Sequence, residues 1–166
     1  MKKKSSLSRL FEYAGNYKYL TVLSWILSAV SAWIALVPFY YIWRIIKEVL
    51  AVAPDYSQAQ NLKGYGWAAV GFALLSMIIY VGSLMCSHVA AFHVQAEMRS
   101  QMMHHIVTLP MGFMDSEGSG KIRKIVNESS AATETYLAHQ LPDQTRSMVM
   151  FLGLLLLIFT CDWRLA

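Results

Sequence analysis

The segment Phe113–Lys124, FMDSEGSGKIRK, comes closest to a motif with its own chemistry. A phosphate-binding loop of the form G-x-x-x-x-G-K-[ST] surrounds phosphates with backbone N–H groups, a lysine and a hydroxyl. If Gly120-Lys121 is aligned with the G-K of this motif, Asp115 occupies the position of the first glycine and Ile122 that of the serine or threonine. Two required positions fail and no buried strand precedes the segment, so the pattern argues against a nucleotide-binding loop.

Other residue types that support catalysis occur without the partners that catalysis needs. Asp115 and Glu117 are close in sequence, but nothing in the sequence supplies a pocket around them. Ser129 and Ser130 have no placed base. The two cysteines and five histidines show no metal-ligand spacing. We therefore expect no catalytic, cofactor-binding or metal site within this chain.

The composition indicates a membrane protein. Of the 166 residues, 56% are apolar and 14% are charged, whereas soluble domains contain about 45–50% and about 25%. Lysines at positions 2–4, with Arg9 and Lys18, precede the first apolar segment. Beside a membrane span, such a basic tail sets topology, so we expect no nucleic-acid partner.

Three apolar segments are predicted to cross the bilayer, at residues 19–43, 67–92 and 141–161. The first two are long and nearly free of charge, as a span of about 20 apolar residues requires. The continuous apolar run of the third is short, so the polar residues before it are expected to face protein or a wet cavity: Gln140, Asp143, Gln144 and Arg146.

The remaining segments connect or flank these spans. Residues 1–18 form a basic tail and an interfacial helix over residues 5–17, with a frayed tail as the alternative. Residues 52–66 contain turn formers and are predicted to be a linker. The second helix should continue past its span, because no breaker occurs before Pro110. Residues 121–140 are predicted to return as a helix.

The basic N-terminus is expected to be cytoplasmic. Residues 93–140 then form a long cytoplasmic hairpin, with FMDSEGSG at its tip. Asp115 or Ser116 is suited to cap a short helix, and Gly118 and Gly120 to end it and reverse the chain. Two interpretations of the tip remain: Phe113 and Met114 dock a partner, or the tip is a plain solvated loop.

The order of these features resembles the N-terminal part of the transmembrane domain of an ABC exporter-type half-transporter. LSRLFEYAGNYKYL is similar to the family's elbow helix, VPFYYIWRII to the outer end of its first span, and DWRLA to its turn between the third and fourth spans. The first intracellular loop of the family follows a pattern that is matched here by Arg99, Leu109-Pro110, Phe113-Met114-Asp115, Ser119-Gly120 and Asn127-Glu128. Methionine and glutamate replace the usual aromatic and aspartate, and both keep the physical character of the position.

The resemblance implies an all-α membrane protein, with residues 19–166 forming part of a six-helix domain. Spans four to six and the nucleotide-binding domain are missing from this sequence, so ATP and Mg belong to a partner domain. The loop tip would be a coupling helix contacting that domain, formed by Phe113, Met114, Asp115, Ser116, Glu117, Gly118, Ser119 and Gly120. The implied partners are the lipid bilayer, this domain and a second half-transporter, in a homodimer or heterodimer.

The implied function is the membrane part of an ATP-driven exporter in the plasma, or cell inner, membrane. Trp33, Leu36 and Tyr40 share a face of the first span and are candidates for the substrate path; lipid contact or packing is the alternative. A second hypothesis is a small membrane sensor or assembly protein that docks a cytoplasmic partner through its helical hairpin.

Overall fold

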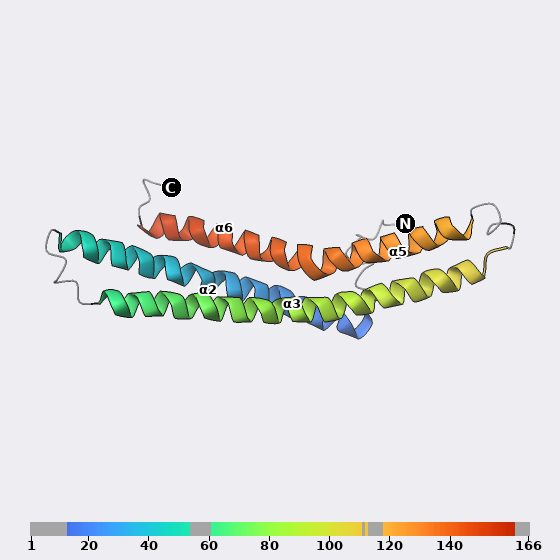
Figure 1. Cartoon of the computed structure of the whole chain (residues 1–166), viewed down its shortest axis with the longest axis horizontal. Helices are drawn as coiled ribbons and strands as arrows, with labels where there is room; N and C mark the ends of the chain where they lie inside the picture. Colours follow the sequence, from blue (N-terminus) through green and yellow to red (C-terminus); the bar gives the residue numbers. More distant parts are fainter. Residues whose placement is uncertain (1–12, 54–60, 111, 113–117, 162–166) are drawn as a thin grey trace. The chain divides into compact units, whose positions relative to one another are not determined.

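The computed structural model describes residues 13–53, 61–110, 112 and 118–161, and every regular element within them is a helix (Figure 1). In chain order these are η1 (Gly15–Tyr17), α2 (Lys18–Ala51), α3 (Leu62–Val107), α5 (Ser119–Thr135), η3 (Tyr136–Gln140) and α6 (Leu141–Cys161). The element η1 is a 3-10 turn and η3 is a π-helical turn. The predicted all-α class is confirmed.

The described residues cover only the end of the predicted interfacial helix. Most of residues 5–17 lies outside the described part of the chain, where Tyr13 and Ala14 are helical and η1 follows. The helix α2 then has 34 residues and continues through Pro38 to Ala51. Membrane helices tolerate an interior proline because neighbouring groups satisfy the freed backbone carbonyl.

The helix α3 has 46 residues and extends to Val107 without interruption, as the absence of breakers before Pro110 predicted. Its first residue is Leu62, so the predicted linker over residues 52–66 is wrong for its last five positions. The N–H of Tyr65 donates to the carbonyl of Asn61 at 3.0 Å and closes the first turn. The low helix propensity of Gly64 and Gly66 is outweighed by the long apolar helix that follows.

The chain from Ser119 to Cys161 is helical throughout, with η3 between α5 and α6. The N–H of Leu141 donates to the carbonyl of Tyr136, five residues back. Pro142, the next residue, has no N–H and cannot continue an α-helical ladder. The wider π turn therefore occurs immediately before the proline.

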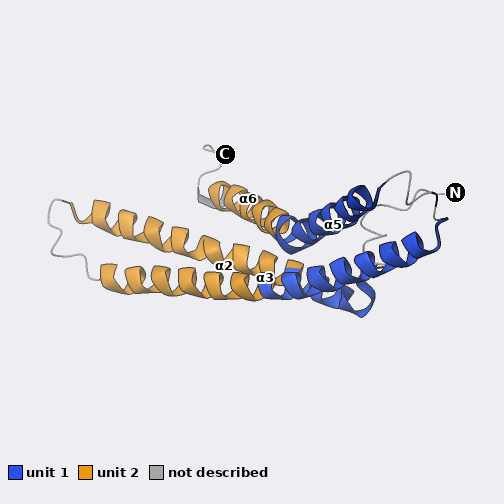
Figure 2. Cartoon of the chain, turned by 45° about the vertical axis from the view of Figure 1, so that its right-hand side comes forward, with its two compact units in different colours: residues 1–24, 84–142 blue, residues 25–83, 143–166 orange. Residues whose placement is uncertain are grey.

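The chain divides into two compact units (Figure 2). Unit 1 comprises residues 1–24 and 84–142, and unit 2 comprises residues 25–83 and 143–166. Within unit 1, η1 packs on α3 through Tyr17 and His93, whose stacked rings are 3.6 Å apart between centroids. Within unit 2, α2 and α3 pack through Tyr41 and Phe72, whose centroids are 6.0 Å apart.

Three described helical stretches are long and apolar enough to cross a membrane: Gly15–Ala51, Leu62–Val107 and Ser119–Phe159. Large apolar side chains cover their outer surfaces, such as Ile78, which is 68% exposed, and Phe151. Small polar residues occupy the packed positions instead, including Ser28, Ser31 and Ser83. Small residues let membrane helices approach closely while lipid covers the bulky ones.

Candidate functional site

Part of the predicted coupling segment can be placed. Phe113, Met114, Asp115, Ser116 and Glu117 lie outside the described residues. Gly118 has a φ of +74° and directly precedes α5, so a glycine suits this turn. Ser119 and Gly120 form the first turn of α5. The expectation that Gly120 lies in the chain reversal is therefore wrong, because α5 begins at Ser119 and Gly120 is its second residue.

The two arms of the hairpin are joined by a side chain that the sequence motif contains. Arg99 of α3 donates from Nε to Oγ of Ser130 on α5 at 2.8 Å. Ser130 is fully buried, and its hydroxyl donates to the carbonyl of Asn127 at 3.1 Å. The motif positions Arg99 and Asn127 are thus linked through one serine, which holds the arms in register.

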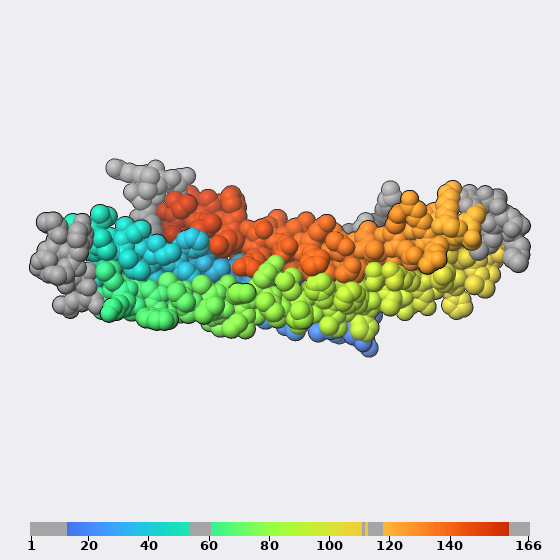
Figure 3. Space-filling view, viewed as in Figure 1, coloured from blue at the N-terminus to red at the C-terminus, as the bar shows by residue number. Residues whose placement is uncertain are grey.

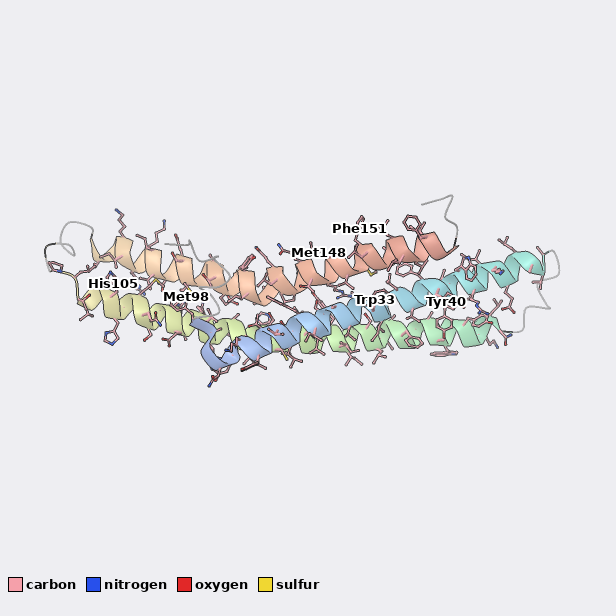
Figure 4. All side chains as sticks on the ribbon, turned by 180° about the vertical axis from the view of Figure 1, so that it is seen from behind. Trp33, Tyr40, Met98, His105, Met148 and Phe151 are labelled. Atoms are coloured by element: carbon pink, nitrogen blue, oxygen red, sulfur yellow. The ribbon has the colours of Figure 1, made fainter. Side chains whose placement is uncertain are left out.

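Towards the tip, the arms enclose an apolar groove with a volume of about 450 Å³. Met98, Met102 and Ile106 of α3 face Ile122 and Val126 of α5 across it. Figure 3 shows the yellow atoms of α3 directly beside the orange atoms of α5. The groove also includes His105, which Figure 4 labels with Met98 on α3. The arms therefore meet through flexible apolar side chains.

At the other end of unit 1, a serine of α3 bonds the π turn. Ser87 Oγ donates to the carbonyl of Leu137 at 2.7 Å, and both residues are buried. In an α-helix this carbonyl would receive the N–H of Leu141, which donates to Tyr136 instead. The ring of His88 lies edge-on to that of His139, with 4.7 Å between centroids. The π turn is thus anchored to α3 by polar contacts.

In unit 2, α2 and α3 approach closely at two serines. Ser76 Oγ donates to the carbonyl of Ser31 at 3.1 Å, and both residues are buried. The hydroxyl of Ser31 in turn donates to the carbonyl of Ser28 at 2.8 Å. Such hydrogen bonds between membrane helices stabilise by about 0.6 kcal/mol on average. They fix the pairing of the helices more than they strengthen it.

The two charged residues at the start of α6 contact one tyrosine of α3. The Tyr80 hydroxyl of α3 donates to Asp143, and the Arg146 guanidinium lies 4.0 Å from the centroid of the same ring. Gln140 and Gln144 are exposed. Asp143 is exposed as well and Arg146 is half-buried, so the two charged residues contact Tyr80 without being enclosed by protein.

The three candidates for the substrate path lie in different surroundings. Leu36 is buried and packs on Gly153 of α6, whereas Trp33 and Tyr40 are exposed (Figure 4). Tyr40 lines a cavity of about 680 Å³ at the C-terminal end of α2, together with Trp43 and Arg44. Trp33 and Leu36 are not part of its lining. The structure does not bring the three side chains into one site.

Within the described residues, no three side chains among His, Cys, Asp and Glu form a group suited to a metal ion. The contacts found instead are structural. Sequence reasoning missed the contacts of Ser87, which it did not single out, and of Ser130, which it considered only as a catalytic residue without a base. The available signal was the face of small residues at Ser83, Ser87 and Ala90, which have the spacing of a helix-packing surface.

Comparison with known proteins agrees with this arrangement. A family model described as the ABC transporter transmembrane region matches residues 21–166. The chain therefore belongs to the ABC transporter transmembrane family and is an integral membrane protein.

Relatives among curated proteins extend beyond the chain. The Mycobactin import ATP-binding/permease protein IrtA of Mycobacterium tuberculosis is 28% identical over 145 residues, which cover 87% of this chain and 16% of that protein. Its namesake in Mycolicibacterium thermoresistibile is 24% identical over the same coverage. The protein of that name in Mycolicibacterium smegmatis is 22% identical, over 90% of this chain and 17% of its own length. The chain thus spans about a sixth of these relatives.

Proposed function

We propose that this chain is the first part of the membrane domain of an ATP-driven ABC transporter, and that its hairpin tip carries nucleotide-driven movement into the membrane. The N-terminus and the hairpin lie on the cytoplasmic side, in the plasma or cell inner membrane. The partner at the tip is a nucleotide-binding domain that supplies ATP and Mg. A second half-transporter completes the substrate path.

The length of α3 carries this proposal. A helix of 46 residues rises about 69 Å at 1.5 Å per residue, whereas the hydrocarbon core of a bilayer is about 30 Å thick. One uninterrupted helix therefore belongs both to the membrane and to the surrounding water. The bond from Arg99 to Ser130 braces its second half against α5, so a displacement at the tip moves both arms together.

The coupling role belongs to the segment Phe113–Gly120. Its apolar residues Phe113 and Met114 suit docking to a protein surface, and Asp115 suits a cap on a short helix. Gly118 supports the proposal from the described side, because its positive φ lets the chain turn directly into α5.

The names of the relatives bear on the direction of transport. The sequence resemblance implied an exporter, whereas all three relatives carry the word import in their names. We use exporter-type for the helix arrangement and propose that direction be read from ATP-driven flux. Accumulation in inside-out vesicles would mean export from the cell, and depletion would mean import. The names make mycobactin the first substrate to assay.

The coupling role is tested with Phe113→Ala and Asp115→Asn. The assay uses a transporter that contains this segment with its nucleotide-binding domain, on one polypeptide or in a complex. We expect ATP hydrolysis to persist while transport per ATP falls about tenfold, the effect of losing roughly 1.4 kcal/mol of coupling. Lys124→Gln, which removes an exposed charge paired with Glu128 on the same arm, is the matched control. Unchanged transport in both tip variants would remove the coupling role.

A further inference from the structure

The cavity at the C-terminal end of α2 is lined by charged and aromatic side chains that helix packing does not require. Its volume is about 680 Å³, within the range of roughly 300–1,000 Å³ that is typical of small-ligand sites. Trp43, Arg44 and Lys47 recur along one face of α2 and line it, and Tyr65 of α3 and Leu157 of α6 complete the wall. All of these residues belong to unit 2.

Its two cations are held by aromatic groups rather than by carboxylates. Arg44 donates from Nε to the hydroxyl of Tyr40 at 2.9 Å, and its guanidinium lies 5.3 Å from the centroid of that ring. The ammonium of Lys47 lies 5.1 Å from the centroid of Trp43. Among the described residues, neither cation has a carboxylate oxygen within 4 Å. Within the described part of the chain, their positive charges are oriented without a carboxylate partner.

The acidic residue of the cavity has its own partner. Glu48 accepts a hydrogen bond from the backbone N–H of Asn61 at 3.2 Å. Asn61 directly precedes α3, so the carboxylate meets the positive end of that helix. This contact orients the Glu48 carboxylate towards α3, and two cations against one carboxylate leave the described lining with a net positive charge.

The surroundings favour an anion that carries apolar chains. Tyr40 and Trp43 are aromatic residues near the end of a membrane span, which is where such rings meet lipid headgroups. Phe39 and Ile46, one turn before and one turn after Trp43 on α2, are about half exposed. A free phosphate would leave these side chains uncovered, whereas the acyl chains of a lipid would lie against them.

The same contacts disfavour a choline headgroup. Aromatic rings bind quaternary ammonium groups through their faces. Here the faces of Tyr40 and Trp43 are already approached by the protein's own Arg44 and Lys47. A second cation at either ring would be repelled, so the site selects against a positively charged headgroup.

We propose that this cavity binds the phosphate of an anionic phospholipid. Arg44 and Lys47 attract the phosphate, Tyr40 positions Arg44, and the exposed Phe39 and Ile46 of α2 contact the acyl chains. The proposal requires that α2 spans a bilayer and is independent of the transport direction.

The test is a lipid titration of the full chain in detergent, with bound lipid counted by native mass spectrometry. The probes are phosphatidylglycerol, phosphatidylcholine and soluble glycerol phosphate. Each cation near a membrane surface contributes to anionic-lipid binding by about fivefold in affinity. We therefore expect Arg44→Gln and Lys47→Gln each to weaken phosphatidylglycerol binding about fivefold and the double variant about twentyfold. Phosphatidylcholine should bind the wild-type chain more weakly than phosphatidylglycerol.

Matched variants separate this site from general surface charge and from misfolding. Lys63→Gln removes an exposed cation on the first turn of α3 that does not line the cavity, and should leave binding unchanged. The charge-preserving exchange Arg44→Lys with Lys47→Arg should keep binding within about twofold of the wild type. Circular dichroism confirms that each variant retains its helices.

Three results would overturn the proposal. The first is a double variant that binds phosphatidylglycerol as the wild type does. The second is an equal loss in Lys63→Gln, which would indicate diffuse electrostatic attraction. The third is complete displacement of the lipid by soluble glycerol phosphate at equal concentration, which would identify a site for free anions.

Discussion

Leu36 of α2 occupies the space in which a Cβ at Gly153 of α6 would lie. Leu36 is 5% exposed, so its side chain is enclosed at this contact. Glycine is the residue that lets the two helices approach this closely. Leu36 therefore contributes to helix packing, while Trp33 and Tyr40, the other candidates for the substrate path, remain on the surface.

We predict that Gly153→Leu destabilises unit 2. The larger side chain must displace Leu36, and overpacking of this kind costs about 1–3 kcal/mol. The measurement is the thermal unfolding midpoint in detergent, which should fall. Adding Leu36→Ala to Gly153→Leu should restore part of the loss.

A control for this substitution is Gly71→Leu in α3. No atom lies within 4 Å of a Cβ built at Gly71, so a side chain there meets open space. The midpoint should stay unchanged or rise, because leucine has the higher helix propensity. An equal fall in both variants would show that the contact with Leu36 is not the cause.

We predict that the hydrogen bond from Arg99 to Ser130 protects the hairpin from opening. Ser130→Ala removes the acceptor and leaves the guanidinium without it, at a cost of about 1.5–3 kcal/mol. Amide hydrogen exchange along α5 should accelerate by about tenfold or more, since 1.4 kcal/mol corresponds to a factor of ten. Arg123→Gln, an exposed residue on the same helix, serves as the control. Identical exchange in the two variants would argue against a brace at this position.

We predict that the π turn depends jointly on Ser87 and Pro142. Ser87→Ala leaves the buried carbonyl of Leu137 without its hydroxyl partner, which costs about 1–3 kcal/mol. Adding Pro142→Ala restores a backbone N–H and allows the segment to return to an α-helical ladder. The double variant should therefore be more stable than Ser87→Ala alone in thermal unfolding. Ser147→Ala, at an exposed position of α6, should have little effect.

We predict that the two ends of α3 lie on opposite sides of the membrane. In a chain whose Cys86 and Cys161 are replaced by serine, an impermeant maleimide should label Ala53→Cys in intact cells. It should label Ser119→Cys only after permeabilisation. Ile78→Cys is an internal reference: its side chain is exposed on the protein but should resist labelling inside the bilayer. Labelling of Ser119→Cys in intact cells would reverse the proposed orientation.

Local pattern predicted the helices well, because long apolar runs and breakers are properties of neighbouring residues. The continuation of α3 to Val107 followed from the absence of a breaker before Pro110. The start of α3 was misplaced because Gly64 was taken as a loop signal, although it lies in the first turn of the helix. The short apolar run of α6 also indicated that Asp143 and Arg146 need polar surroundings, and both contact Tyr80.

Local sequence pattern could not predict the contacts between helices, because these contacts join residues that are distant in sequence. Ser130 is 31 positions from Arg99, and Asp143 is 63 positions from Tyr80. The spacing of small residues can indicate a packing face, but it does not identify the one partner that each hydroxyl group bonds on another helix. The cavity beside Tyr40 was missed for the same reason: its wall needs Tyr65 and Leu157 in addition to α2.

The π turn at Tyr136–Gln140 has a consequence for how this protein is compared with its relatives. A five-residue hydrogen-bonded step contains one residue more than the α-helical step, and one residue corresponds to about 100° around a helix axis. Relatives that lack the turn would match the segments before and after it only with a one-residue gap. An ungapped alignment would pair lipid-facing positions with packed ones from Leu141 onward, and would misassign every functional residue transferred along that helix.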